Sequence, residues 1–167
     1  MLVALAVATL LLIGAWSWLW TVAGASRDYG RRAETAADLA FAERLITREL
    51  RAAVRLVPDA GVGCSERSLS MALRSPGASA EDPVSYVWDP GRGVVWRKTA
   101  STYVAEHVTL FRVTYFDEQG APIVPADAGR LSAHQAVVVA RVLVEMCVRQ
   151  GGSSANASWQ IALEAGQ

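Results

Sequence analysis

The hydrophobic and polar positions divide the chain into three stretches with different periods. The first, MLVALAVATLLLIGAWSWLWTV, carries no charge, and the first charged residue of the chain is Arg27. The second keeps apolar side chains at helical spacing, and the third mostly alternates polar and apolar positions. The pattern predicts an apolar helix over residues 1–25, an amphipathic continuation of the same helix over 26–58, and a β-rich head over 59–167.

The apolar stretch is long enough to cross a membrane. A helix of about 22 residues is roughly 33 Å long, which matches the hydrocarbon core of a bilayer. Three tryptophans stand near its end, where indole rings favour the membrane–water interface. We expect the following side chains to face lipid or neighbouring helices: Leu2, Val3, Leu5, Val7, Leu10, Leu11, Leu12, Ile13, Trp16, Trp18 and Trp20.

A cleaved signal peptide and a plain signal anchor are the competing interpretations of this stretch. The small residues 23–25 resemble a cleavage site, but the apolar run is long and lacks a basic segment in front of it. Arg27, Arg31 and Arg32 follow the run, and the positive-inside rule would then keep the rest of a plain anchored chain in the cytoplasm.

The amphipathic stretch has two faces. Its apolar stripe consists of Leu39, Ala42, Ile46, Leu50, Ala53 and Val57, and we expect Pro58 and Gly61 to end the helix. Nearly opposite lies a basic ridge formed by Arg44, Arg48, Arg51 and Arg55. Three interpretations of the basic ridge stay open: a solvated helix face, a surface that meets acidic groups of neighbouring subunits or lipid headgroups, and a DNA contact.

Short strands are predicted in the third stretch. We expect them over residues 68–73, 84–88, 94–98, 108–116, 136–149 and 158–163, with hairpin turns at DPGRG and DEQG. In the strand over 136–149, Val138, Ala140, Val142, Val144, Met146 and Val148 share the face that should pack on the helix. The fold class expected is therefore α+β, with a long N-terminal helix packed on an antiparallel sheet.

Charge and residue chemistry favour a structural protein over an enzyme. Lys and Arg number 16 and Asp and Glu also 16, so the net charge of zero disfavours binding that depends on neutralising phosphates. His107 and His134 stand in no metal-ligand spacing, and no nucleophile elbow or phosphate loop is present. Asp117 and Glu118 fit an ordinary turn better than a calcium site. We expect no catalytic residue, no metal and no cofactor; the glycosylation-like triplet at Asn156 we attribute to chance.

Three segments resemble the type IV pilin and pseudopilin family. MLVALAVATLLL is similar to the segment that follows a glutamate in the precursors, which read like G-F-T-L-V-E and then M-L-V-A-L-A. LITRELRAAVRL resembles the L-x-R-D-L-R-x-A stretch of J-type minor pseudopilins and W-type minor pilins, with Glu49 in place of the commoner aspartate. VSYVWDPGRGVVWRK followed by FRVTYFDEQG resembles their hairpin and following strand.

The resemblance implies a minor pilin or pseudopilin of a pilus, a type II secretion system or a DNA-uptake filament. It implies an inner-membrane protein with an extracytoplasmic head, and as partners sister pilins, inner-membrane lipid and the assembly platform. It also implies that Met1 is an internal methionine, preceded by a basic leader and the family's glutamate. The alternative is a membrane-anchored extracytoplasmic binding domain that contacts DNA, and an anchored hydrolase has no supporting residues.

Two cysteines would lie in such an exported head. Cys64 follows the helix and Cys147 lies on the polar face of the strand over 136–149. A disulfide between them would close a long loop and stabilise the head by roughly 4 kcal/mol in the chain-entropy model. We expect this disulfide to form in the exported head, and two separate thiols are the alternative.

Overall fold

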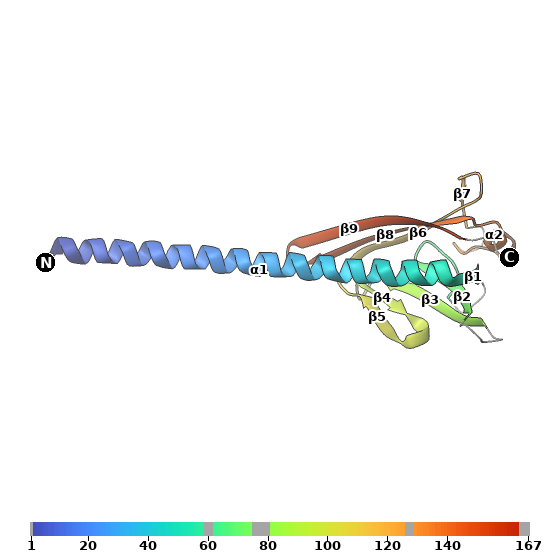
Figure 1. Cartoon of the computed structure of the whole chain (residues 1–167), viewed down its shortest axis with the longest axis horizontal. Helices are drawn as coiled ribbons and strands as arrows, with labels where there is room; N and C mark the ends of the chain where they lie inside the picture. The colour runs from blue at the N-terminus through green and yellow to red at the C-terminus, as the bar shows by residue number, and fades with distance from the viewer. Residues whose placement is uncertain (1, 59–61, 75–80, 126–128, 164–167) are drawn as a thin grey trace.

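A single long helix projects from a β-rich head (Figure 1). The computed structural model describes residues 2–58, 62–74, 81–125 and 129–163, with side chains from Val7 onward. Helix α1 (Leu2–Ala52) runs without interruption from the bare end into the head. The chain is therefore α+β, with a long N-terminal helix packed on antiparallel sheets, as the sequence predicts and in an arrangement consistent with a pilin-like fold.

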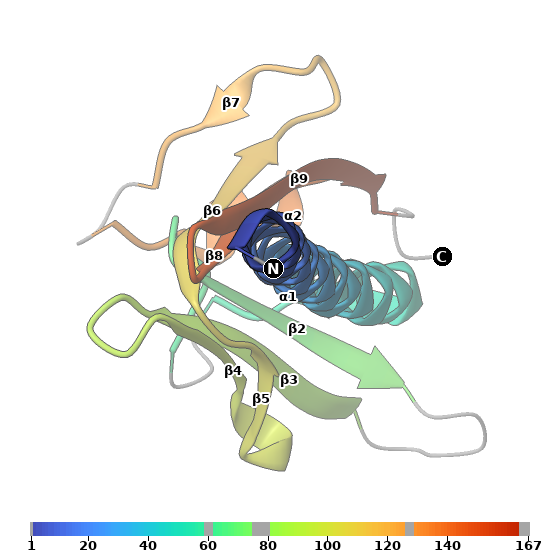
Figure 2. The same ribbon diagram turned by 90° about the vertical axis from the view of Figure 1, so that its left-hand side faces the viewer.

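Two antiparallel sheets pack against the second half of α1. The first has the order β1-β2-β3-β4-β5, with β1 (Ala53–Leu56), β2 (Ser68–Arg74), β3 (Glu81–Asp89), β4 (Val94–Arg97) and β5 (Thr102–Ala105). The second has the order β7-β6-β8-β9, with β6 (Val108–Phe116), β7 (Pro122–Ile123), β8 (Arg141–Gln150) and β9 (Ser153–Ala162). Viewed along the helix, β8 and β9 lie on one side of α1 and β2 and β3 on the other (Figure 2).

The core lies between α1 and the two sheets. Leu39, Ala42, Ile46 and Leu50 of the predicted stripe are at most 6% exposed. They belong to one cluster with buried residues of both sheets, which include Tyr86, Phe111, Val142, Val144, Met146 and Trp159. Because a fully buried leucine or isoleucine contributes about 1.5–3 kcal/mol, this stripe fixes the helix on the head.

Helix α1 ends earlier than the sequence predicts. The helical period continues to Val57, but the helix ends at Ala52 and the next four residues form β1, which pairs with β2. Val54 is β-branched and suits a strand, and Leu56 is 5% exposed on β1. The predicted end at Pro58 is therefore wrong, because pairing with the edge of β2 outweighs the local helical period. Gly61, the other predicted stop, lies outside the described residues.

The predicted strands are confirmed except at one place. Strand β6 has the predicted bounds, β2, β3, β4 and β9 overlap their predictions, and Asp89 and Asp117 begin the two predicted turns. The start of the strand over 136–149 is wrong: residues 133–137 form helix α2 (Ala133–Val137), and β8 begins at Arg141. Val138 is consequently 46% exposed and does not share the buried face of Val142 to Val148. Strands β1, β5 and β7 were not predicted.

Candidate functional site

The first half of α1 is bare. Every side chain from Val7 to Gly30 is exposed, and Leu10, Leu11, Leu12 and Ile13 are each more than 60% exposed. This part of α1 is apolar and long enough to span a membrane. Its most apolar stretch lies near the N-terminus, and none of that stretch is buried. Leu2, Val3 and Leu5 belong to the same helix, but their side chains lie outside the described residues.

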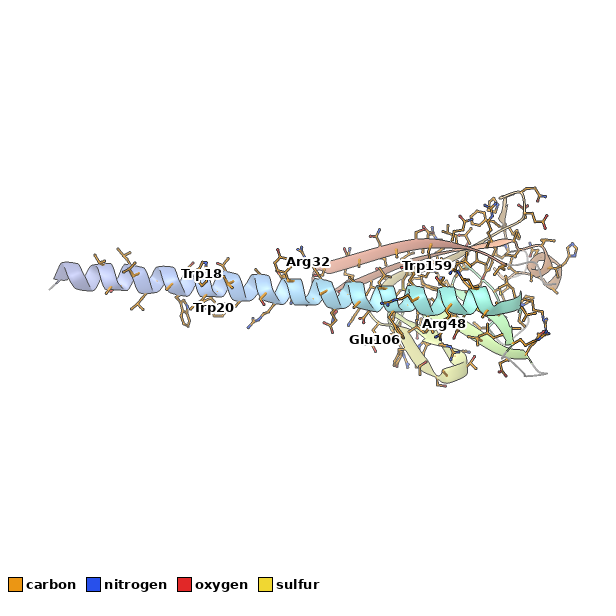
Figure 3. All side chains as sticks on the ribbon, viewed as in Figure 1. Trp18, Trp20, Arg32, Arg48, Glu106 and Trp159 are labelled. Carbon is orange, nitrogen blue, oxygen red and sulfur yellow. The ribbon has the colours of Figure 1, made fainter. Side chains whose placement is uncertain are left out.

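Three tryptophans surround the end of this apolar half. Trp16, Trp18 and Trp20 are 65%, 65% and 61% exposed, and Trp16 and Trp20 meet edge to face at 6.4 Å between ring centroids. Figure 3 shows Trp18 and Trp20 on the bare part of the helix, well before the head begins. Rings that combine an apolar body with an N–H donor suit the boundary between hydrocarbon and water.

The head begins at Arg31. Its guanidinium pairs with Asp28 on the preceding turn, and its side chain lies against Gly151 in the turn between β8 and β9. One turn further, Thr35 is 1% exposed and its hydroxyl donates to the carbonyl of Arg31. Contact with the head therefore starts about 11 residues after Trp20, so a neck of about 16 Å at 1.5 Å per residue separates the tryptophans from the head.

The basic ridge is only partly formed. Arg44, Arg48 and Arg51 are exposed on α1, and together with Glu43 and Thr47 they line a shallow hollow of about 350 Å³. Arg55 lies instead on β1, where its Nε donates to Glu81 Oε2 at 3.0 Å. We call the three helical residues Arg44, Arg48 and Arg51 the arginine row.

The arginine row forms no ion pair with any residue that the structure describes, although Glu43 lines the same hollow. The Nε of Arg44 donates to the carbonyl of Ala40 at 3.1 Å. None of the residues three or four positions before or after each arginine is acidic. Like charges at these spacings destabilise a helix by about 0.2–0.5 kcal/mol per pair, so the arginine row opposes folding slightly.

A buried charge cluster holds the opposite face of α1. Glu49 is 5% exposed, and its Oε1 lies 2.8 Å from an Nη of Arg97 on β4. Its Oε2 accepts from the Tyr86 hydroxyl at 2.5 Å and from Arg97 Nε at 3.3 Å. Burial, the hydrogen bond to Glu49 and the nearby negative charge raise the pKa of Tyr86. This cluster joins α1 to β3 and β4, and it fixes which face of the helix points outward.

Sequence reasoning missed this cluster. Glu49 stands three residues after Ile46 and next to Leu50, so an acidic residue interrupts the side of the helix predicted to be buried. A buried carboxylate needs a cation and hydrogen-bond donors. Arg97, at the end of VVWR, is one of the arginines that could supply them. The position of Glu49 was the signal, but the sequence does not identify which arginine meets it.

The structure has both cysteines free, which differs from the expected disulfide between Cys64 and Cys147. Cys64 is buried in the core, where its thiol donates to the carbonyl of Ser70 at 3.2 Å and burial raises its pKa. Cys147 belongs to the half-buried positions of β8 that alternate with its core-facing residues. Cys64 therefore lies in the core, whereas Cys147 lies at a position of β8 that alternates with the core-facing ones.

The remaining polar candidates lie apart on the head surface. His107 is in the turn before β6, His134 is on α2 and Asn156 is on β9, and all three side chains are exposed. The Asp117 carboxylate accepts from the N–H of Ala121 at 2.8 Å within its turn. Among the described residues, no three His, Cys, Asp or Glu side chains group in a way that could hold a metal ion.

No protein-family model matches the chain, and no curated protein matches it significantly.

Proposed function

We propose that this chain is a non-enzymatic structural subunit of an envelope filament of the type IV pilin class, a minor pilin or pseudopilin. The filament would be a pilus, a type II secretion filament or a DNA-uptake filament, with the subunit in its tip or initiation complex. The single observation that carries the proposal is the bare first half of α1, which continues without a break into a helix held firmly by the head.

The bare half requires a cover. Leaving a large apolar side chain in water instead of burying it costs about 1.5–3 kcal/mol, and the exposed leucines, Ile13 and the tryptophans add up to a helix that cannot stay in water. Lipid covers it in the inner membrane, with the head on the extracytoplasmic side. Lipid tails and neighbouring apolar helices are similar environments, so transfer into a bundle of sister helices changes little hydrophobic free energy. An assembly platform can therefore move the subunit out of the membrane without a large cost in hydrophobic free energy.

The continuity of α1 supports a mechanical role. Buried side chains between Leu39 and Leu50 attach the helix to both sheets, and the Glu49 cluster adds a polar attachment to β3 and β4. Force applied to the apolar half is consequently transmitted to the head through a hydrogen-bonded helix with a packed end. A subunit that is moved by its helix needs this arrangement.

The alternative is a membrane-anchored extracytoplasmic binding domain. One apolar helix is enough for an anchor, and the arginine row would then serve a ligand such as DNA. An anchor needs lipid only, whereas a filament subunit also needs contacts between helices. Substitutions in the apolar half distinguish the two if membrane attachment and complex formation are measured separately.

The test uses the full chain in its own cells. Leu12→Glu places a charge in the apolar half, and Val124→Glu is the matched control on the head, since the two side chains are 71% and 76% exposed. Membrane attachment is measured by carbonate extraction. Assembly is measured as recovery of the chain together with other proteins after extraction in mild detergent. Mass spectrometry identifies these proteins, and their sequences are searched for a similar apolar helix and β-rich head.

We expect the unsubstituted chain and Val124→Glu to be recovered in such a complex. A glutamate inside a bundle of helices lacks a partner and costs several kcal/mol, so Leu12→Glu should reduce recovery at least tenfold. A chain that is held in the membrane but is never recovered with similar proteins would support the anchored binding domain instead.

A further inference from the structure

We propose that the arginine row binds a carboxylate-bearing surface of a sister subunit. This inference rests on the proposed function and names the chemistry of one of its contacts. The arginine row is a surface separate from the bare half of α1, since it lies where the helix runs along the head; Figure 3 marks Arg48 there.

The arginine row makes no charged contact with the described part of the head. The three guanidinium groups form no ion pair with the described residues, and no acidic residue stands one helical turn away from any of them. Placing three like charges along one side of a helix is unfavourable in the isolated subunit. An acidic partner turns this unfavourable arrangement into a favourable one, and arginine is common at the centres of protein interfaces.

Lipid headgroups cannot be the partner of an embedded subunit. Arg44 stands about 36 Å further along the helix axis than Trp20, at 1.5 Å per residue. The headgroup layer on each side of the hydrocarbon is only about 5–8 Å thick. With the tryptophans at the interface, the arginine row therefore lies well beyond the membrane, at the height of the head.

The spacing describes the surface that fits. Arg44 and Arg48 are four residues apart and Arg48 and Arg51 three, so the charges follow the helix axis over about 10 Å. Phe41 lies one turn before Arg44 and is 55% exposed, which adds an apolar contact at one end. A complementary surface presents two or three carboxylates at intervals of about 5–6 Å beside an apolar side chain, as a helix with acids at positions i, i+4 and i+7 does.

The first experiment uses the scarcity of lysine. Lys98 is the only lysine in the sequence, so Lys98→Arg removes the natural side-chain site for carbodiimide coupling to carboxylates. In that background, Arg48→Lys keeps the positive charge and introduces one reactive amine in the arginine row. Arg149→Lys, at an exposed position on β8, is the matched control. Cell envelopes that contain the full-length variants are treated with a water-soluble carbodiimide.

We expect Arg48→Lys to form an amide with an aspartate or glutamate of a subunit that has a similar apolar helix and head. The control should give at most a tenth of that adduct, and 1 M salt should reduce the adduct several-fold because the Debye length falls to about 3 Å. Absence of a protein adduct from Arg48→Lys overturns the proposal. The proposed function survives that result if recovery with similar proteins still depends on Leu12.

A second experiment reverses the charges. The triple variant Arg44→Glu, Arg48→Glu and Arg51→Glu is compared with a control of equal net charge, Lys98→Glu, Arg130→Glu and Arg149→Glu. All six side chains are exposed. We expect a tenfold or greater loss of recovery with sister subunits for the first variant only, and melting temperatures of both heads within a few degrees of the unsubstituted head.

Two other outcomes contradict the proposal. Unfolding of the head by the first variant would mean that the arginine row has a structural role. If the first variant lost binding to DNA while its recovery with sister subunits stayed unchanged, the arginine row would be a nucleic-acid contact.

Discussion

The buried carboxylate of Glu49 should respond very differently to the loss of each of its partners. Its side chain is 6% exposed, whereas the side chain of Arg97 is 23% exposed. Water can therefore solvate the guanidinium if the carboxylate is removed, but it cannot solvate the carboxylate if the guanidinium is removed. The structure thus predicts that Arg97→Met is more damaging than Glu49→Gln.

The two magnitudes follow from the same contacts. Breaking a buried ion pair and leaving one charge behind costs about 3–5 kcal/mol, and the partial exposure of Arg97 places Arg97→Met near the lower end, about 3 kcal/mol. Glu49→Gln leaves an amide that still accepts from Tyr86, so only the charge-assisted part is lost, about 1–2 kcal/mol. The double variant should cost about 2 kcal/mol, less than Arg97→Met alone, because no buried charge remains.

The assay is equilibrium unfolding of the head, residues 26–167. Removing the first 25 residues preserves the packing of the head, because the side chains from Val7 to Gly30 are all exposed. Urea titration gives the free energy of unfolding. A thermal scan should show melting temperatures lower by roughly 10 °C for Arg97→Met and by roughly 5 °C for Glu49→Gln, at about 3 °C per kcal/mol for this size.

Two results would show that the Glu49 charge does not hold α1 on the head. If Glu49→Gln were the more damaging variant, the carboxylate would matter for a reason other than its charge. If neither variant moved the free energy of unfolding by more than about 0.5 kcal/mol, the cluster would be open to water and would not hold α1 on the head.

Three further predictions concern the head. Burial raises the pKa of Tyr115 far above its usual value; the folded head therefore keeps the proton that the unfolded chain loses above about pH 10. Stability should then fall as pH rises past 10, and Tyr115→Phe should make that fall shallower by about 1.4 kcal/mol per pH unit, measured by urea titration. Gly63 and Gly129 both have positive φ, but an added Cβ would lie 2.5 Å from a backbone oxygen only at Gly63. Gly63→Ala should lower the free energy of unfolding by more than 2 kcal/mol and Gly129→Ala by about 1, and equal losses would mean that the close approach at Gly63 is absent. Cys147, which is half-buried, should react with a thiol reagent before Cys64, which is buried and should react only on unfolding; a linked peptide pair in non-reduced protein would contradict the positions of the two cysteines.

Features that depend on local composition could be predicted from the sequence. The apolar half of α1 can be predicted from its length and residue types, because its side chains from Val7 onward make no contact with the head. The buried stripe from Leu39 to Leu50 and the arginine row follow from helical spacing once the helix is identified. The fold class follows from the change of period between the helix and the head.

Features that depend on distant contacts could not be predicted. The end of α1 at Ala52 is set by pairing of β1 with β2, and Arg55 leaves the basic ridge for that reason. The ion pair between Glu49 and Arg97 joins residues 48 positions apart. Helix α2 is a different case, because Ser132 and Gln135 form a capping box whose S-x-x-Q pattern stands in the sequence. The three valines at 137–139 favour a strand in the sequence, but in the structure the capping box prevails and residues 133–137 are helical.

We propose that the bare half of α1 is covered first by lipid and then by the helices of sister subunits. The most direct measurement places a photoreactive phenylalanine analogue at Leu12 of the full-length chain in growing cells, with Val124 as the control position. After illumination, we expect Leu12 to form adducts with lipid and with proteins that have a similar apolar helix, joined through that helix. Val124 should form no such protein adduct. If Leu12 formed adducts with lipid alone in cells that assemble filaments, the bare half of α1 would be a membrane anchor and would not pack against sister helices.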